Sequence, residues 1–318
     1  MATAGPIDLV PRSTRPVARG AAVPAGRPHS RRRRIGVVVL FGLAILVLWE
    51  AAKWIGGVPW RFENVLGTGL AIDHDPPFRW AFANDLNLPH WFAILGALAG
   101  PVQRNAEASL GQFLAGAAFY TWREAAIGFV VGALLGLVLA TIFVHSRLLE
   151  RAFVPYVVAS QTIPIVALAP MIVYAVGPNV AAVVIIATYL TFFPVTIAMI
   201  RGLRSPDPRA LELMRSYAAG RWDIYRKVRL PASLPYLFTA LKIAATASIV
   251  GAIIGEGPGG IPDGLGRAII NFNQYYITGP EKLWGSILVS ALLGVSFFAL
   301  IRVLEILVLR GRPGAAEG

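Results

Sequence analysis

The chain contains no cysteine and little charge. None of its 318 residues is a cysteine, which excludes disulfides and thiolate metal sites. Only 14% of the residues are Asp, Glu, Lys or Arg, whereas about 25% is usual for a globular domain. Hydrophobic residues make up 56% of the chain, and its mean hydropathy is +0.63. This composition is typical of a protein that lies largely within a membrane.

The common motifs of catalysis and nucleotide binding are also missing. No G-x-x-x-x-G-K-S/T loop is present to cradle the phosphates of ATP. The sequence has no H-E-x-x-H motif, and its four histidines show no metal-ligand spacing. The sequence therefore predicts that the chain is not an enzyme and binds no metal or cofactor.

Long runs without charge identify the expected membrane helices. About 20 apolar residues are needed to cross a hydrocarbon core of about 30 Å as a helix. Four runs meet this length without charge, and two more meet it when one or two charged residues are accepted. The predicted spans are residues 35–56, 125–144, 152–176, 180–200, 230–254 and 283–301. The predicted fold class is therefore an all-α polytopic membrane protein with six transmembrane helices.

Basic residues are distributed unevenly between the expected loops. Residues 1–34 hold eight arginines among Pro, Ala and Gly, and this composition predicts a disordered tail. With the tail in the cytoplasm, alternation of the spans leaves 21 Lys and Arg residues inside and six outside. The positive-inside rule then favours cytoplasmic N- and C-termini. This topology explains the net charge of +12 without a nucleic-acid partner.

The predicted spans divide the chain into parts. These are a disordered basic tail, a first transmembrane helix, an extracytoplasmic segment, a five-helix core and a second cytoplasmic tail, at residues 1–34, 35–56, 57–118, 119–310 and 311–318. In the outer segment, residues 91–100 are apolar but too short to cross, so an interfacial helix is expected. The core contains a basic cytoplasmic loop at 202–231. Because no cleavage site follows the first apolar run, we interpret it as a retained helix.

Glycines and prolines mark two of the spans. Gly128, Gly132 and Gly136 recur every four residues, which predicts close packing against another helix. Prolines interrupt the span at 152–176, so a kink or a break is expected there. Broken helices survive at membrane depth where they pack in protein or line a cavity. The stretch with Gln161, Pro164 and Pro170 is therefore a candidate for pathway lining, with a merely kinked structural helix as the alternative. Gln161, Pro164 and Pro170 are thus the candidate pathway residues, and the three glycines are the candidate helix-packing residues.

The cytoplasmic loop at 202–231 is expected to form two short helices. Asp207 and Pro208 suit an N-cap and a first helical position. Short helices are marginal alone and need a packing partner. Each short helix has apolar residues along one side. Two surfaces could pack against that side: a groove of a partner protein, or the anionic surface of the membrane.

This loop resembles the EAA loop of permeases of ATP-binding cassette (ABC) importers. The pattern is Glu-Ala-Ala, three residues, Gly, nine residues, and then an aliphatic residue, any residue and Leu-Pro. The residues at the matching positions are Glu212, Ala218, Val228, Leu230 and Pro231. The two alanines of the pattern are replaced, and Ala218 stands where the pattern has glycine. The resemblance implies that this loop is the coupling helix that seats in a cleft of the ATPase, and Trp222 is its candidate aromatic anchor.

The resemblance covers residues 115–310 and is closest to the nitrate, sulfonate, taurine and vitamin-precursor branch. Stretches that carry it include QTIPIVALAPMIVYAVG and KVRLPASLPYLFTALKIA. It implies a type I importer permease in a prokaryotic cell membrane, working as a homodimer or a close heterodimer with a separate ATPase and an external binding protein. Residues 271–284 are most similar to riboflavin or pyrimidine-precursor (thiamine-precursor) permeases, with sulfonate or nitrate-type anions as the next substrates.

Charged residues in the membrane leave a second function open. A secondary transporter driven by an ion gradient usually carries ionisable groups at mid-membrane. Lys242 is the clear candidate here, and snorkelling or pairing with a backbone carbonyl is its structural alternative. Glu256 ends the same span in a glycine-rich stretch and is interpreted as a gate or a binding-protein contact, against a solvated loop acid. Glu124 is expected at the membrane interface.

Overall fold

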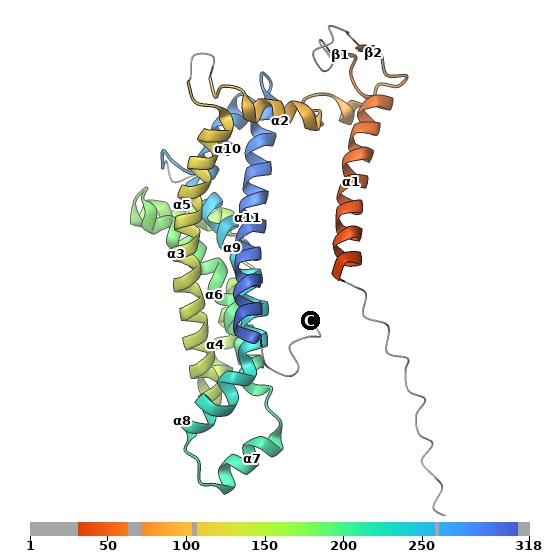
Figure 1. Ribbon diagram of the computed structural model, residues 1–318. Coiled ribbons are helices and arrows are strands. Elements are labelled where there is room, and N and C mark those ends of the chain that lie inside the picture. Colours follow the sequence, from red (N-terminus) through yellow and green to blue (C-terminus); the bar gives the residue numbers. More distant parts are fainter. Residues whose placement is uncertain (1–30, 63–71, 104–106, 258–260, 311–318) are drawn as a thin grey trace, which may run out of the picture. The chain divides into compact units, whose positions relative to one another are not determined.

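The chain folds almost entirely as helices. The computed structural model describes residues 31–62, 72–103, 107–257 and 261–310, and Figure 1 shows its elements. The long helices are α1 (Arg31–Gly56), α3 (Leu110–His145), α6 (Val180–Arg204), α9 (Leu230–Glu256) and α11 (Pro280–Leu309). The shorter ones are α2 (Trp91–Ala99), α4 (Arg147–Ser160), α5 (Ile165–Val176), α7 (Pro208–Ser216), α8 (Arg221–Ile224) and α10 (Leu265–Gln274). Strands β1 (Trp60–Phe62) and β2 (Ile72–His74) pair antiparallel in the expected outer segment and were not predicted.

The number of membrane helices agrees with the sequence. Among the described residues, five helices are long and apolar enough to cross, and α4 with α5 makes a sixth if this bent pair is one span. The pair is bent by 98°, and Pro164 lies at the break as the N-cap of α5. Pro155 and Pro170 lie inside α4 and α5, respectively. The predicted fold class of an all-α polytopic membrane protein is confirmed.

Internal contacts divide the chain into residues 1–49 and 50–318, and the boundary lies within α1. In the first unit, α1 begins at Arg31, four residues before the predicted start. Its apolar side chains between Val37 and Leu48 are mostly exposed. The rest of the predicted tail, residues 1–30, lies outside the described residues, as does the C-terminal tail at 311–318.

Helices α3, α6 and α9 form the packed part of the second unit. A methyl group added at Gly132 would lie 2.6 Å from Thr191 Cβ, and one at Gly136 would lie 2.7 Å from the Phe192 carbonyl oxygen. Gly128 meets α6 in the same way, with Ala187 Cβ only 2.4 Å from the added carbon. The glycine face of α3 therefore lies directly against the backbone of α6, as small residues at four-residue spacing allow.

Two element boundaries differ from the prediction for local reasons. Helix α3 begins at Leu110, before the predicted core start at 119, because Ser109 and Gln112 form a capping box. The Ser109 hydroxyl accepts from the Gln112 N–H at 3.2 Å, and the Gln112 side chain accepts from the Ser109 N–H at 3.1 Å. At the other end of the core, α8, a π-helical turn (Tyr225–Arg229) and α9 run on as one helix. Pro231 has no N–H to donate four residues back, which accounts for the irregular turn before it.

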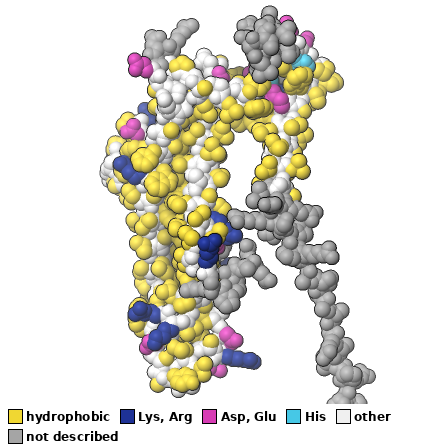
Figure 2. Space-filling view, viewed as in Figure 1, with side chains coloured by type: hydrophobic (Ala, Val, Ile, Leu, Met, Phe, Trp, Pro, Cys, Tyr) yellow, Lys and Arg dark blue, Asp and Glu magenta, His cyan; other side chains and the backbone are white. Residues whose placement is uncertain are grey.

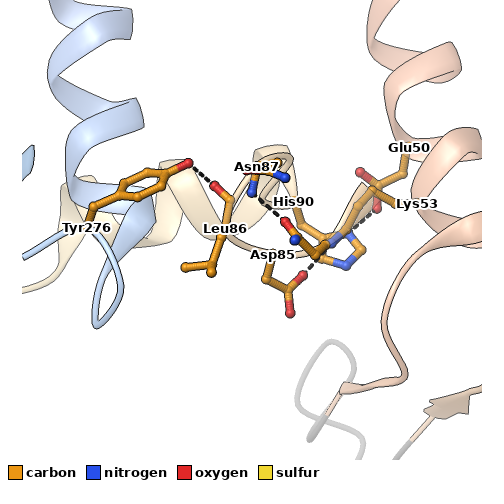
Figure 3. A network of polar contacts seen from close by, with 8 residues as sticks. Glu50, Lys53, Asp85, Leu86, Asn87, His90 and Tyr276 are labelled. Atoms are coloured by element: carbon orange, nitrogen blue, oxygen red, sulfur yellow. Dashed lines mark hydrogen bonds and ion pairs between the residues drawn. The ribbon is translucent and has the colours of Figure 1, made fainter. Parts of the chain in front are cut away.

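The segment after α1 is held together by polar contacts, shown in Figure 3. Lys53 is fully buried and pairs with Asp85. The His90 ring nitrogen Nδ1 lies 2.6 Å from Glu50 Oε1. The Tyr276 hydroxyl donates to the Leu86 carbonyl and so links this segment to the chain between α10 and α11. Residues far apart in sequence therefore fix the predicted interfacial region, in which α2 matches the expected short helix.

Candidate functional site

The loop at 202–231 presents a short exposed helix at one end of the bundle (Figure 1). Asp207 caps α7 by accepting from the Arg209 N–H at 2.8 Å, and Pro208 takes the first helical position. None of the residues of α7 is buried. Glu212 is exposed, and the neighbouring Tyr217 is 78% exposed. Helix α7 therefore gains little from packing within this chain, and its surface is free for another molecule.

Ala218 has a backbone conformation that explains the glycine of the EAA pattern. Its φ is +53°, and it is the one non-glycine residue of the described chain with positive φ. The Ala218 N–H donates to the Arg215 carbonyl at 2.9 Å, and the Ala219 N–H donates to the Met214 carbonyl at 3.0 Å. These two bonds form a Schellman motif, whose left-handed residue is usually glycine. The loop keeps the turn of the pattern although it lacks the glycine.

Helix α8 is anchored from behind and carries an exposed aromatic side chain. Tyr225 is buried, and its hydroxyl lies 2.9 Å from Thr141 Oγ1 on α3. Trp222 is 63% exposed and stacks on Tyr225 with ring centroids 5.2 Å apart. The remaining positions of the EAA pattern are half-buried: Val228 lies in the π-helical turn, and Leu230 and Pro231 begin α9. Glu212, Ala218 and Trp222 are thus exposed, while the Leu-Pro end of the pattern anchors the loop to the bundle.

The candidate pathway residues lie where α4 breaks away from α5. Gln161 is half-buried at the C-cap of α4, and its Nε2 has no hydrogen-bond partner among the described residues. Pro164 and Pro170 are exposed. The hydroxyl of Tyr189 on α6 donates to the Ser160 carbonyl and so ties the break to the packed helices. The structure therefore places these residues on an open face of the chain.

Apolar surface is unusually exposed along the same pair of helices. No residue of α4 is buried, and α5 buries only Ala169 and Val173. Tyr174 is 94% exposed and Met171 is 67% exposed. Figure 1 shows α5 projecting sideways from the bundle. Exposed apolar patches of this kind mark contact with a membrane or with another protein.

Lys242 has a partner that the sequence did not indicate. Its Nζ lies 3.0 and 2.9 Å from the two carboxylate oxygens of Glu305 on α11. Arg302 Nη1 lies 2.6 Å from the same carboxylate. The ion cluster ties α9 to α11, so the Lys242 ammonium is paired with a carboxylate rather than with a backbone carbonyl. Glu305 lies four residues beyond the last predicted span, 283–301, and could have been noticed there as the acidic residue next to an apolar run.

Glu256 is fully buried at the outer end of α9 and is not a solvated loop acid. Its Oε2 accepts from the Gly266 N–H at 2.7 Å. At Gly264, where φ is +100°, an added methyl would lie 2.3 Å from the Glu256 carboxyl carbon. The absence of a side chain at Gly264 lets the turn before α10 close over this carboxyl group. Glu256 therefore holds the first turn of α10 against the end of α9.

Glu124 is buried within the protein beside Glu256. Its side chain is fully buried, and neither of its carboxyl oxygens has a hydrogen-bond partner in the part of the chain that the structure describes. The Arg123 guanidinium lies over the Tyr120 ring, 5.0 Å from its centroid.

These features define the class of the protein. Long apolar helices, a broken span with an exposed apolar face, and an exposed pair of short helices at one end describe a polytopic membrane subunit that assembles with other proteins. Residues 132–309 match the family described as binding-protein-dependent transport system inner membrane component, and the chain belongs to that family.

Three relatives show where the chain stands within the family. The formylaminopyrimidine transport permease protein ThiX of Halalkalibacterium halodurans is 34% identical over 58% of this chain and 73% of its own length. The riboflavin transport system permease protein RibX of Chloroflexus aurantiacus is 33% identical over 52% of this chain and 61% of its own length. The putative aliphatic sulfonates transport permease protein SsuC of Bacillus subtilis is 27% identical over 59% of this chain and 67% of its own length. The predicted ABC permease branch and the multi-pass location in a bacterial inner membrane are confirmed.

Proposed function

We propose that this chain is the translocation subunit of an ATP-driven importer and takes up a small organic nutrient that an external binding protein delivers. The family match supports a permease of an ABC importer for small nutrients. The observation that carries the rest is the exposed α7–α8 loop, in which Ala218 completes the turn of the EAA pattern. In this proposal the loop docks on a separate ATPase, which hydrolyses ATP.

The substrate we favour is a vitamin or vitamin precursor with a heteroaromatic ring. Two relatives above 30% identity carry a substrate in their names, formylaminopyrimidine and riboflavin. The sulfonate relative is less similar, at 27% identity. A pyrimidine precursor or riboflavin is therefore the first choice, and an aliphatic sulfonate or a nitrate-type anion is the next.

Two copies of the permease are part of the proposal. Six spans are too few to enclose a wide pathway, and α4 and α5 expose apolar side chains along most of their length. A second copy would cover this face, and the residues at the break, Gln161, Pro164 and Pro170, would then lie between the two subunits. ATP-driven closure of the ATPase pair would move the two loops together and switch access to the pathway. Glu256 would act at the outer end as part of the gate.

Uptake by the reconstituted system tests this function. The permease, its ATPase and its binding protein are placed in proteoliposomes, and uptake of labelled pyrimidine precursor or riboflavin is measured. We expect uptake to stop when the phosphate-loop lysine of the ATPase is replaced and to survive collapse of the proton gradient at constant ATP. Uptake that follows the proton gradient and ignores the ATPase change would favour a secondary transporter instead.

A further inference from the structure

A cavity of about 880 Å³ opens at the end of the bundle that carries α7 and α8. Its walls come from the last turn of α3, the first half of α4, the end of α6 and the π-helical turn before α9. Four arginines line it, namely Arg147, Arg151, Arg204 and Arg229. Figure 2 shows basic side chains gathered at this end of the molecule. The charge bias of the loops assigns this end to the cytoplasm.

The arginines of the cavity outnumber its acidic groups. Glu150 is the one carboxylate among the described lining residues, and it is paired with Arg204. Arg229 is half-buried and donates to the Leu203 carbonyl at 3.3 Å. Three guanidinium groups therefore share a cavity without a carboxylate of their own. Like charges in a partly desolvated site repel one another, and a bound anion would offset this repulsion. Guanidinium groups suit phosphate because they donate two parallel hydrogen bonds to it.

The rest of the lining favours an amphiphile over a free anion. Arg147, Arg151, Val154 and Pro155 follow one another at helical spacing and share one face of α4. The charged pair lies at the cytoplasmic end of this face, and the apolar pair is centred about 8 Å further along the helix at about 1.5 Å per residue. A phospholipid has the same order, with its phosphate at the headgroup level and acyl chains beyond it. An inorganic phosphate would use only the basic half.

We propose that this cavity binds the headgroup of an anionic phospholipid of the inner leaflet. Arg147, Arg151 and Arg229 contact the phosphate, and Val154 and Pro155 lie against the first methylenes of an acyl chain. Basic pockets between membrane helices on the cytoplasmic side are suited to such headgroups. The exposed basic residues Arg226 and Lys227 of the π-helical turn do not line this cavity.

The position of the site gives bound lipid a consequence for the loop. Arg204 is the last residue of α6, and Arg229 comes directly before α9. The cavity therefore lies between the two ends of the segment that carries α7 and α8. A lipid that bridges α4 to Arg229 would stabilise the two ends of this segment. In the assembled importer, ATP hydrolysis would then depend on anionic lipid. This consequence rests on the proposed function above.

Binding to the purified full-length chain tests the site without assuming transport. A fluorescent phosphatidylglycerol is titrated in detergent micelles, with phosphatidylcholine as the reference lipid. We expect saturable phosphatidylglycerol binding that Arg147→Gln/Arg151→Gln weakens by at least about tenfold, since each basic residue contributes about 1 kcal/mol near an anionic lipid. The matched control, Arg226→Gln/Lys227→Gln, removes the same charge outside the cavity and should change the affinity less than about twofold.

Each other outcome overturns the proposal. Equal losses in the two double variants would show charge attraction without a site. Displacement of the lipid by millimolar inorganic phosphate would show an anion site that does not require a lipid. Unchanged lipid binding together with lost ATPase co-purification would show that the arginines serve the ATPase. Arg151→Glu, at an exposed position, replaces the double variant if that variant fails to fold, with the same tenfold loss expected. Because lipid binding is measured on the permease alone, a failure here leaves the proposed transport function untouched.

Discussion

Helices of the second unit that are similarly apolar in sequence differ in burial. Helices α3, α6 and α9 bury many residues against one another, with glycines of α3 touching the α6 backbone. Helix α5 is at least as apolar as these three but buries only Ala169 and Val173. Hydrophobicity alone therefore does not decide which membrane helices pack within the chain. Small residues that let two backbones approach decide it, because lipid is as apolar as a leucine side chain.

The same difference in burial predicts which substitutions affect the stability of the permease and which affect its assembly with other molecules. The packed helices stabilise this chain by contacts within it, whereas α4, α5, α7 and Trp222 offer surface to a second molecule. Substitutions in the first group should lower the stability of the isolated permease. Substitutions in the second group should leave it unchanged and affect complexes.

The largest effect is expected from Gly132→Val in the packed part. The added side chain would collide with the Thr188 carbonyl oxygen and with Thr191, since the first carbon already lies 2.8 and 2.6 Å from them. Overpacking of this kind costs about 1–3 kcal/mol, occasionally more, and we expect the upper end here because one of the groups is backbone. Thermal unfolding in detergent measures the loss. Gly116→Val on the same helix is the control, because an added carbon there meets nothing within 4 Å. Equal melting temperatures of the two variants would contradict the role of the glycine face.

The next effect is expected on assembly, from Trp222→Ala. Trp222 is 63% exposed, so the fold of the permease should survive its loss. As an aromatic anchor it should contribute about 2 kcal/mol to ATPase docking, and co-purification with the ATPase should weaken by roughly 30-fold. Trp222→Phe keeps an aromatic ring on Tyr225 and should retain much of the binding.

Glu212→Ala should weaken the same complex, while Arg226→Gln/Lys227→Gln should affect it less. If the loop instead rests on lipid headgroups, the two basic residues would matter more than Glu212 and Trp222. Normal co-purification and uptake in both alanine variants would remove the coupling role from α7 and α8.

A smaller, stabilising effect is expected from Ala218→Gly. An alanine at φ +53° is strained, because its Cβ crowds the following carbonyl group in the left-handed region. Glycine removes this strain but gains freedom in the unfolded chain, so the net gain should be about 0.5–1 kcal/mol. Protection of the α7 amides from hydrogen exchange should increase accordingly. Ala219→Gly, at the next residue, should not increase it.

The smallest effect on the isolated chain is expected from Tyr174→Ser. This side chain is 94% exposed, and exposed substitutions usually change stability by no more than about 0.5 kcal/mol. If a second copy covers α5, cross-linking or sedimentation of the permease pair should nevertheless show weaker association. Loss of monomer stability, or unchanged pairing together with normal uptake, would show that this face is not a subunit interface.

Some interactions that hold the chain together were beyond reach of a single sequence. Lys242 and Glu305 are 63 positions apart, and no local pattern indicates that they meet. Glu124 and Glu256 likewise lie on different helices, and each alone reads as an acid at the end of an apolar run. The early start of α3 was a different case, since Ser109 and Gln112 show the capping box in the sequence itself. The continuity of α8 with α9 was hidden by Pro231, which usually marks the start of a helix.

The sequence by itself determined the number of spans, the break near Pro164 and the cytoplasmic loop with its EAA spacing. These follow from local rules, since a helix in lipid needs only length and low charge, and proline or a turn acts on its own neighbours. Only the tertiary structure decided which helices are packed, that Glu256 is buried against Glu124, and that four arginines share one cavity. Those outcomes depend on how distant segments approach in space, and that approach is set by backbone contact at small residues and by pairing of buried charges.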